Sequence, residues 1–67
     1  MLTWENTVEI VSILKARHPG TRVQDLSLNT IYQWTIEIPG FEDDRELVND
    51  EILYSILREW FEEVNPV

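Results

Sequence analysis

A run of four carboxylates in five positions is the stretch of this chain best suited to chemistry. Glu42, Asp43, Asp44 and Glu46 surround Arg45 within the segment PGFEDDRE. Carboxylate oxygens are hard ligands, suited to magnesium, calcium, manganese or ferrous iron rather than to zinc. The same charges could instead form a docking surface for a basic partner, or a solvated loop.

The spacing of these acids does not fit an established cation loop. Three of them alternate as in an EF-hand, but Leu47 stands where the turn glycine belongs and Leu53 where the closing glutamate belongs. Adjacent side chains also cannot all converge on one ion. We therefore expect no tight metal site, and the residues alone favour a solvated loop. A weak, exposed site formed by Glu42, Asp43 and Asp44 stays open.

Catalytic chemistry has little support elsewhere in the chain. There is no cysteine and a single histidine, His18, so no pairing of a nucleophile with a base stands out. His18 precedes Pro19 and is most simply the last residue of a helix. Neither glycine lies in a phosphate-binding motif. The sequence predicts that the protein is not an enzyme.

The charge distribution restricts the class of partner. The net charge is -8, yet residues 1–36 hold three acids and three bases, which cancel. Residues 37–67 hold ten acids against Arg45 and Arg58 alone. This field repels nucleic acid and anionic membrane, and it attracts a basic protein surface or a cation.

Length and composition predict one small domain covering residues 1–67. The absence of cysteine favours a reducing compartment, and we expect a cytoplasmic monomer. No apolar run approaches the roughly 18 residues of a membrane span, and the first residues do not resemble a leader peptide. Seven aromatic residues spread along the chain are expected to supply much of its core.

Two helices are predicted from apolar spacing. The first covers residues 7–18, with Asn6 and Glu9 as a capping box and Pro19-Gly20 as its end. The second starts after Asn49, a good N-cap, and continues for about four turns with Asp50 in its first turn.

The segment IYQWTIEI, residues 31–38, is ambiguous. Alternation of apolar and polar residues favours a half-buried strand. Spacings of three and four between apolar residues permit a short helix instead, capped by Asn29 or Thr30 and ended by Pro39-Gly40.

Taken together, the residues resemble the IscX proteins, small acidic components of bacterial iron-sulfur cluster assembly. The similarity extends over nearly the whole chain, with the matching residues in the same order and at the same spacing. It is carried by Trp4, Glu9-Ile10, Leu14, Pro19, Gln33-Trp34, Phe41-Glu42-Asp43-Asp44, Asn49, Ile52-Leu53, Ile56-Leu57, Trp60 and Glu62-Glu63.

The resemblance implies a mainly α, winged-helix-like domain of about three helices with little or no sheet, in which the segment around Trp34 is helical. It also implies a non-catalytic regulator that docks on the basic surface of a pyridoxal-dependent cysteine desulfurase, in competition with frataxin and ferredoxin. Ferrous iron would bind weakly, with no tightly bound cofactor. The alternatives are an iron donor to the cluster scaffold and a generic protein interaction domain.

Carried over by position, the resemblance assigns the partner contact to acidic residues in three places. The chain departs from the family at Asn6 and Tyr54, where acids are usual, and at Arg45 in the acidic run, which could pair with a neighbouring aspartate. Several possible iron ligands are thus missing, and partner binding is better supported than iron binding. The expected contact residues are Glu42, Asp43, Asp44, Asp50, Glu62 and Glu63.

Overall fold

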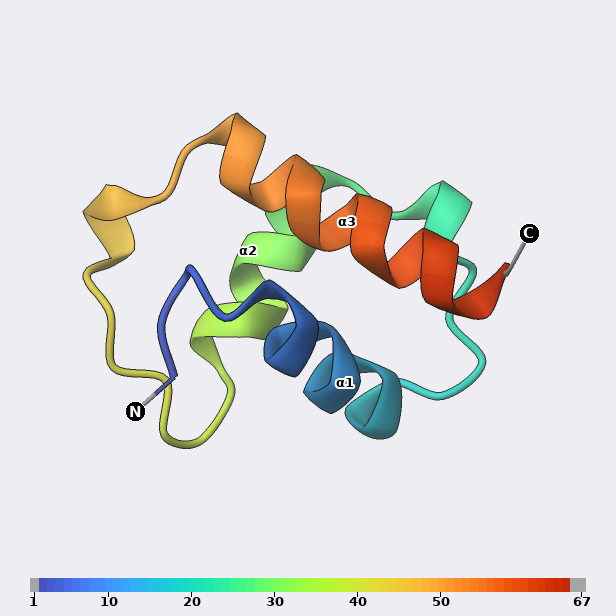
Figure 1. The fold of residues 1–67 in the computed structure, drawn as a ribbon, viewed down its shortest axis with the longest axis horizontal. Helices are drawn as coiled ribbons and strands as arrows, with labels where there is room; N and C mark the ends of the chain where they lie inside the picture. The colour runs from blue at the N-terminus through green and yellow to red at the C-terminus, as the bar shows by residue number, and fades with distance from the viewer. Residues whose placement is uncertain (1, 66–67) are drawn as a thin grey trace.

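The computed structural model describes residues 2–65 as three α-helices and two short 3-10 helices around one core (Figure 1). Helix α3 packs against both α1 and α2, and the molecule measures 32 × 21 × 18 Å along its principal axes. The elements are α1 (Thr7–Arg17), η1 (Val23–Asp25), α2 (Leu28–Ile36), η2 (Arg45–Leu47) and α3 (Asp50–Val64).

The predicted fold class, mainly α with about three helices and little or no sheet, is confirmed. Over residues 2–65 the only β-type pairing is an isolated parallel bridge between Leu2 and Phe41. Within the same range, no helix has both the length and the apolar character that crossing a membrane requires.

Helix α1 begins where it was predicted, but its predicted side-chain cap is wrong. Asn6 occupies the N-cap position without capping any helical N–H group. Its Oδ1 atom instead accepts hydrogen bonds from the backbone N–H (2.9 Å) and the hydroxyl (3.2 Å) of Thr3. An asparagine side chain bonds readily to nearby backbone, and here the preceding turn outcompetes the helix.

The end of α1 agrees with the prediction to within one residue. His18 is the C-cap, and its backbone N–H donates to the carbonyl of Leu14 at 2.9 Å. Its imidazole stacks on Trp34 of α2, with ring centroids 3.7 Å apart and planes only 6° from parallel. His18 is therefore a helix-terminal residue that also joins α1 to α2.

The ambiguous segment is helical over residues 31–36, so the resemblance was right and the preference for a strand was wrong. The cap of α2 is Ser27 rather than Asn29 or Thr30, and its hydroxyl accepts from the N–H of Thr30 at 3.1 Å. The alternation misled because Thr35, counted as a surface residue, is fully buried. Its hydroxyl donates to the Ile31 carbonyl at 2.7 Å, which satisfies the buried polar atom within the helix.

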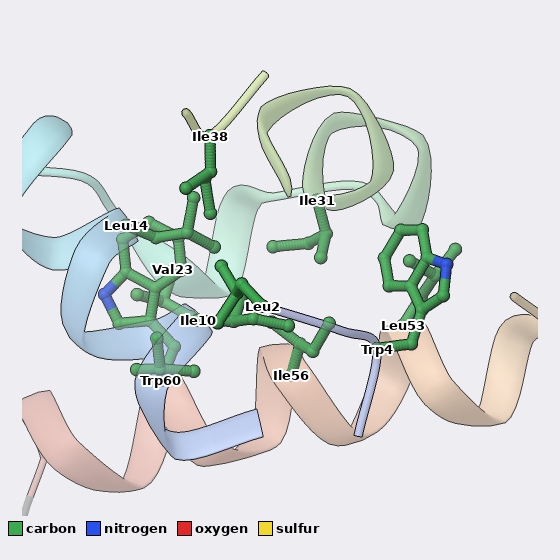
Figure 2. Packing of buried hydrophobic residues seen from close by; sticks show 11 residues of the cluster. Leu2, Trp4, Ile10, Leu14, Val23, Ile31, Ile38, Leu53, Ile56 and Trp60 are labelled. Carbon is green, nitrogen blue, oxygen red and sulfur yellow. The ribbon is translucent and has the colours of Figure 1, made fainter. Parts of the chain in front are cut away.

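The core lies between the three helices and has a tryptophan toward each end (Figure 2). Trp4 and Trp60 are 3% and 2% exposed, while the aliphatic side chains between them are almost fully enclosed. Ile31 of α2 and Ile56 of α3 point into the middle of this core from opposite sides, and neither has any exposed surface. This core fixes the position of α3, and with it the side-chain carboxylates of Glu62 and Glu63 near the end of that helix.

Candidate functional site

The acidic loop, defined here as residues 42–46, lies at one end of the molecule (Figure 1). It is attached there to the buried Trp4. Asp43 Oδ2 accepts a hydrogen bond from the Trp4 backbone N–H at 3.1 Å, and the Asp44 carbonyl accepts one from Trp4 Nε1 at 2.9 Å. The Glu42 N–H donates to the Leu2 carbonyl at 3.0 Å. The loop is thus held in place and is not a freely solvated connection.

Trp4 serves as the anchor because its ring is itself locked into the core. It packs edge-on against Phe41, with centroids 4.7 Å apart, and stacks with Tyr32 of α2 at 6.0 Å. Aromatic pairs of this geometry contribute about 0.5–1.5 kcal/mol beyond simple area burial. The loop is therefore supported by residues from two distant parts of the sequence: Trp4 near the N-terminus, and Tyr32 and Phe41 closer to the loop.

Within the acidic loop, two of the carboxylates bind the loop's own backbone. Asp43 Oδ1 accepts from the Asp44 N–H at 2.8 Å, and Asp44 Oδ1 accepts from the Glu46 N–H at 2.9 Å, which caps η2. The ion pair considered for Arg45 with Asp43 or Asp44 is not found among residues 2–65. The charge of Arg45 lies in the loop without cancelling a particular carboxylate.

Glu42 and Asp50 are the members of the predicted set whose side chains have no internal partner. Both are exposed, and no hydrogen bond or ion pair to either carboxylate is found within residues 2–65. Asp50 is the first residue of α3, where a negative charge is favoured by the helix dipole. Asn49 caps this helix as predicted, its Oδ1 accepting from the Ile52 N–H at 2.9 Å.

The C-terminal acids, by contrast, are both engaged. Glu62 accepts from Arg58 one turn earlier at 3.1 Å, and Glu63 accepts from Lys15 of α1 at 3.1 Å. Twelve residues of helix separate Asp50 from Glu62, which corresponds to about 18 Å at 1.5 Å per residue. The six predicted contact residues therefore fall into two groups at opposite ends of α3 and do not form one continuous cluster.

Glu59 and Glu63 lie one turn apart on α3. The hydrogen bond that a protonated Glu59 would form with the Glu63 carboxylate is the main cause that raises the pKa of Glu59. Partial desolvation and the negative charges of Glu63 and Glu62 act in the same direction. Glu63 Oε2 is buried and has no hydrogen-bond partner in the described part of the chain. The raised pKa of Glu59 therefore reflects its neighbouring carboxylates and does not indicate a ligand site.

The arrangement of the acids does not build a metal centre. Across residues 2–65, no group of three or more His, Cys, Asp or Glu side chains lies where it could hold an ion. Glu42, Asp43 and Asp44 are consecutive but not convergent, since both oxygens of Asp43 already accept backbone N–H groups. What the site can do chemically is present fixed negative charge.

Sequence reasoning missed two kinds of residue at this site. Glu51 was not considered as a contact residue, and Glu46 was named in the acidic run but left out of the predicted contact set; both are exposed, and their adjacency to Asp50 and Asp44 was the signal for including them. The anchoring role of Trp4 had no local signal, because its partner Asp43 lies 39 residues away in the sequence.

Comparisons with known proteins assign this chain to a family. Residues 2–65 match the family described as iron-sulphur cluster assembly. An uncharacterised protein of Pseudomonas aeruginosa is 27% identical over 62 residues, which cover 92% of this chain and 94% of that relative. Because the family match extends over nearly the whole chain, the protein belongs to the iron-sulphur cluster assembly family, as its resemblance to the IscX proteins predicted.

Proposed function

We propose that this protein is a non-catalytic acidic adaptor of iron-sulfur cluster assembly that docks on the basic surface of a cysteine desulfurase. In this role it competes with frataxin and ferredoxin for that surface and regulates sulfur delivery. It acts as a monomer in the cytoplasm and does not bind nucleic acid or membrane. Two facts support the proposal: membership of the assembly family and a net charge of -8 concentrated in residues 37–67.

The observation that carries the proposal is the state of Glu42 and Asp50. Both carboxylates are exposed on anchored backbone, and neither has an ion-pair partner within the described residues. An acid already paired inside the protein must give up that partner before it binds another cation, whereas these two need not. Fixed, unpaired surface charge steers a complementary partner and selects against the wrong one.

The six predicted contact residues then take different parts in docking. Glu42, Asp44 and Asp50 meet basic side chains of the desulfurase directly, while Asp43 positions the loop through its bond to Trp4. Glu62 contributes from the far end of α3, where Arg58 already offsets part of its charge. Glu63 contributes least, because Lys15 pairs with it and its exposed fraction is only 26%.

A role as an iron donor is less well supported than docking on the desulfurase. Donating iron to the scaffold calls for carboxylates that converge on one ion, and residues 2–65 offer no such group. We propose that iron contacts Glu42, Asp43 and Asp44 weakly, because both oxygens of Asp43 already accept backbone N–H groups. A titration with ferrous iron tests this: broadening of those three residues at micromolar metal favours an iron donor, and diffuse broadening at millimolar metal favours the adaptor.

The docking proposal is tested by measuring affinity for the desulfurase at low and high ionic strength. The double variant Glu42→Gln/Asp50→Asn removes both unpaired charges without changing side-chain size. Exposed ion pairs contribute about 0.2–1 kcal/mol each, so two lost pairs raise Kd about two- to thirtyfold at low ionic strength. The loss shrinks as salt screens the charges.

The matched control is Glu9→Gln, which removes one exposed charge from α1, outside the predicted contact set. We expect it to change Kd less than either single variant of the contact pair. Equal affinity for the wild type and the double variant at low ionic strength overturns the proposed contact. Absence of wild-type binding overturns the proposed function itself.

A further inference from the structure

Helix α3 and η1 form a small open groove whose lining includes none of the six predicted contact residues. The α3 groove encloses about 260 Å³ and is lined by Val23, Gln24, Tyr54, Leu57, Arg58 and Phe61. Small-molecule sites typically enclose about 300–1,000 Å³, so this groove is undersized for a drug-sized ligand. Its size suits one or two protein side chains.

Two aromatic rings in this groove are exposed without a structural reason within the described chain. Tyr54 is 58% and Phe61 45% exposed, although Trp60, which precedes Phe61 in the sequence, is 2% exposed in the core. The core of residues 2–65 is complete without them, since Leu53, Ile56 and Trp60 already form the buried face of α3. Tyrosine and phenylalanine are enriched at the centres of protein interfaces, where their large rings become buried.

The position of the groove links it to the acidic residues. Asp50, Tyr54, Leu57 and Phe61 follow one another at spacings of four, three and four, so they share one face of α3. Glu62 follows Phe61 directly and flanks this face near the other end of the helix. A partner that contacts both Asp50 and Glu62 must therefore lie across the groove.

From this arrangement we propose that the α3 groove receives an aliphatic or aromatic side chain that projects from the basic surface of the desulfurase. The inference rests on the proposed function and adds an apolar anchor to it. Charge complementarity selects this occupant: an apolar side chain surrounded by lysine or arginine matches a mainly apolar groove between carboxylates, in which the charge of Arg58 is already offset by its ion pair with Glu62. A second copy of this chain is disfavoured, because it brings another net charge of -8 to the same surface.

Charge and apolar burial make separable contributions to binding kinetics. Peripheral charges mainly set the association rate and its dependence on salt, whereas a buried central anchor mainly sets the dissociation rate. Removing an anchor ring therefore speeds dissociation at every ionic strength. Removing Asp50's charge slows association, and this effect fades as salt is raised.

The test measures association and dissociation rates with immobilised desulfurase for Phe61→Ser, Tyr54→Ser and Asp50→Asn. The matched control is Val8→Ser, which removes a 61% exposed apolar side chain from α1, outside the groove. Each groove variant should dissociate about tenfold faster or more than wild type, with little change in association rate. The Val8 variant should bind like wild type.

The outcomes separate the two proposals. If wild type binds and both groove variants dissociate no faster than Val8→Ser, the groove is not an anchor, and the charge-based contact stands. If wild type does not bind, the proposed function fails and the anchor with it. If sedimentation shows wild-type dimers that Phe61→Ser converts to monomers, the occupant is a second copy and the inference is overturned. Two exposed positions are tested so that a folding defect in one leaves the other informative.

Discussion

Replacing Asp43 by alanine should destabilise the whole domain, although this residue lies in an exposed acidic run. Its carboxylate accepts one hydrogen bond from the backbone N–H of Trp4 and another from that of Asp44. Trp4 is 3% exposed, so its N–H has little access to replacement water. The substitution leaves a poorly solvated donor without a partner.

The magnitude follows from these two bonds. A hydrogen bond to a charged acceptor contributes about 1.5–3 kcal/mol when buried, and the half-buried position of Asp43 lowers this to about 1–2 kcal/mol. A single core of this size seldom supplies more than about 3–5 kcal/mol of net stability. With a urea m-value of about 1 kcal/mol per molar, the unfolding midpoint falls by about 1–2 M.

Urea unfolding followed by tryptophan fluorescence measures this effect, because Trp4 is both the anchor and a reporter. Asp43→Asn keeps one carbonyl acceptor and should lose about half as much free energy. The matched control is Glu42→Ala, an exposed neighbour whose side chain has no partner within residues 2–65, and it should change stability by less than about 0.5 kcal/mol. Equal midpoints for Asp43→Ala and Glu42→Ala would refute the anchoring role.

Three further substitutions test other contacts by the same unfolding measurement. Asn49→Ala removes the cap of α3 and should cost about 1 kcal/mol, and an unchanged midpoint would contradict the capping role. Glu59→Gln should stabilise the protein at neutral pH, because it removes repulsion with Glu63. The raised pKa of Glu59 means that the folded state binds its proton more tightly, so wild-type stability falls as pH rises through that folded pKa. The Gln variant should lose this dependence, and an unchanged pH profile contradicts the pairing. His18→Ala should cost about 0.5–1.5 kcal/mol through the lost stack on Trp34, and no change would show that the rings do not interact.

Local chemistry explains which helix boundaries could be predicted. Asn49 caps α3 as its sequence context indicated, because an N-cap bond joins residues only three positions apart. Asn6 has the same context, but the turn at Thr3 offers its side chain closer donors. In α2, the buried hydroxyl of Thr35 bonds within its own helix, which a pattern of apolar and polar residues does not reveal.

The candidate site was harder to predict because its supports are distant in sequence. The resemblance to the IscX proteins predicted one set of six contact residues. In the structure these residues form two groups, because α3 separates Asp50 from Glu62 by about 18 Å. The net charge can be read directly from the sequence, but the fold determines which carboxylates form ion pairs within the protein. Glu63 is paired with Lys15, 48 residues earlier, while Glu42 has no such partner in the described chain.

The most direct test of the docking account is a titration of isotope-labelled protein with the cysteine desulfurase, followed by NMR at low and high ionic strength. If the protein docks through its acidic residues, backbone signals at Glu42, Asp44 and Asp50 should show salt-sensitive perturbation, with the outer face of α3 perturbed alongside them. Signals around Val8 on α1 should stay unchanged. Perturbation confined to α1, or shifts at the acidic loop that do not respond to salt, would contradict an acid-led contact.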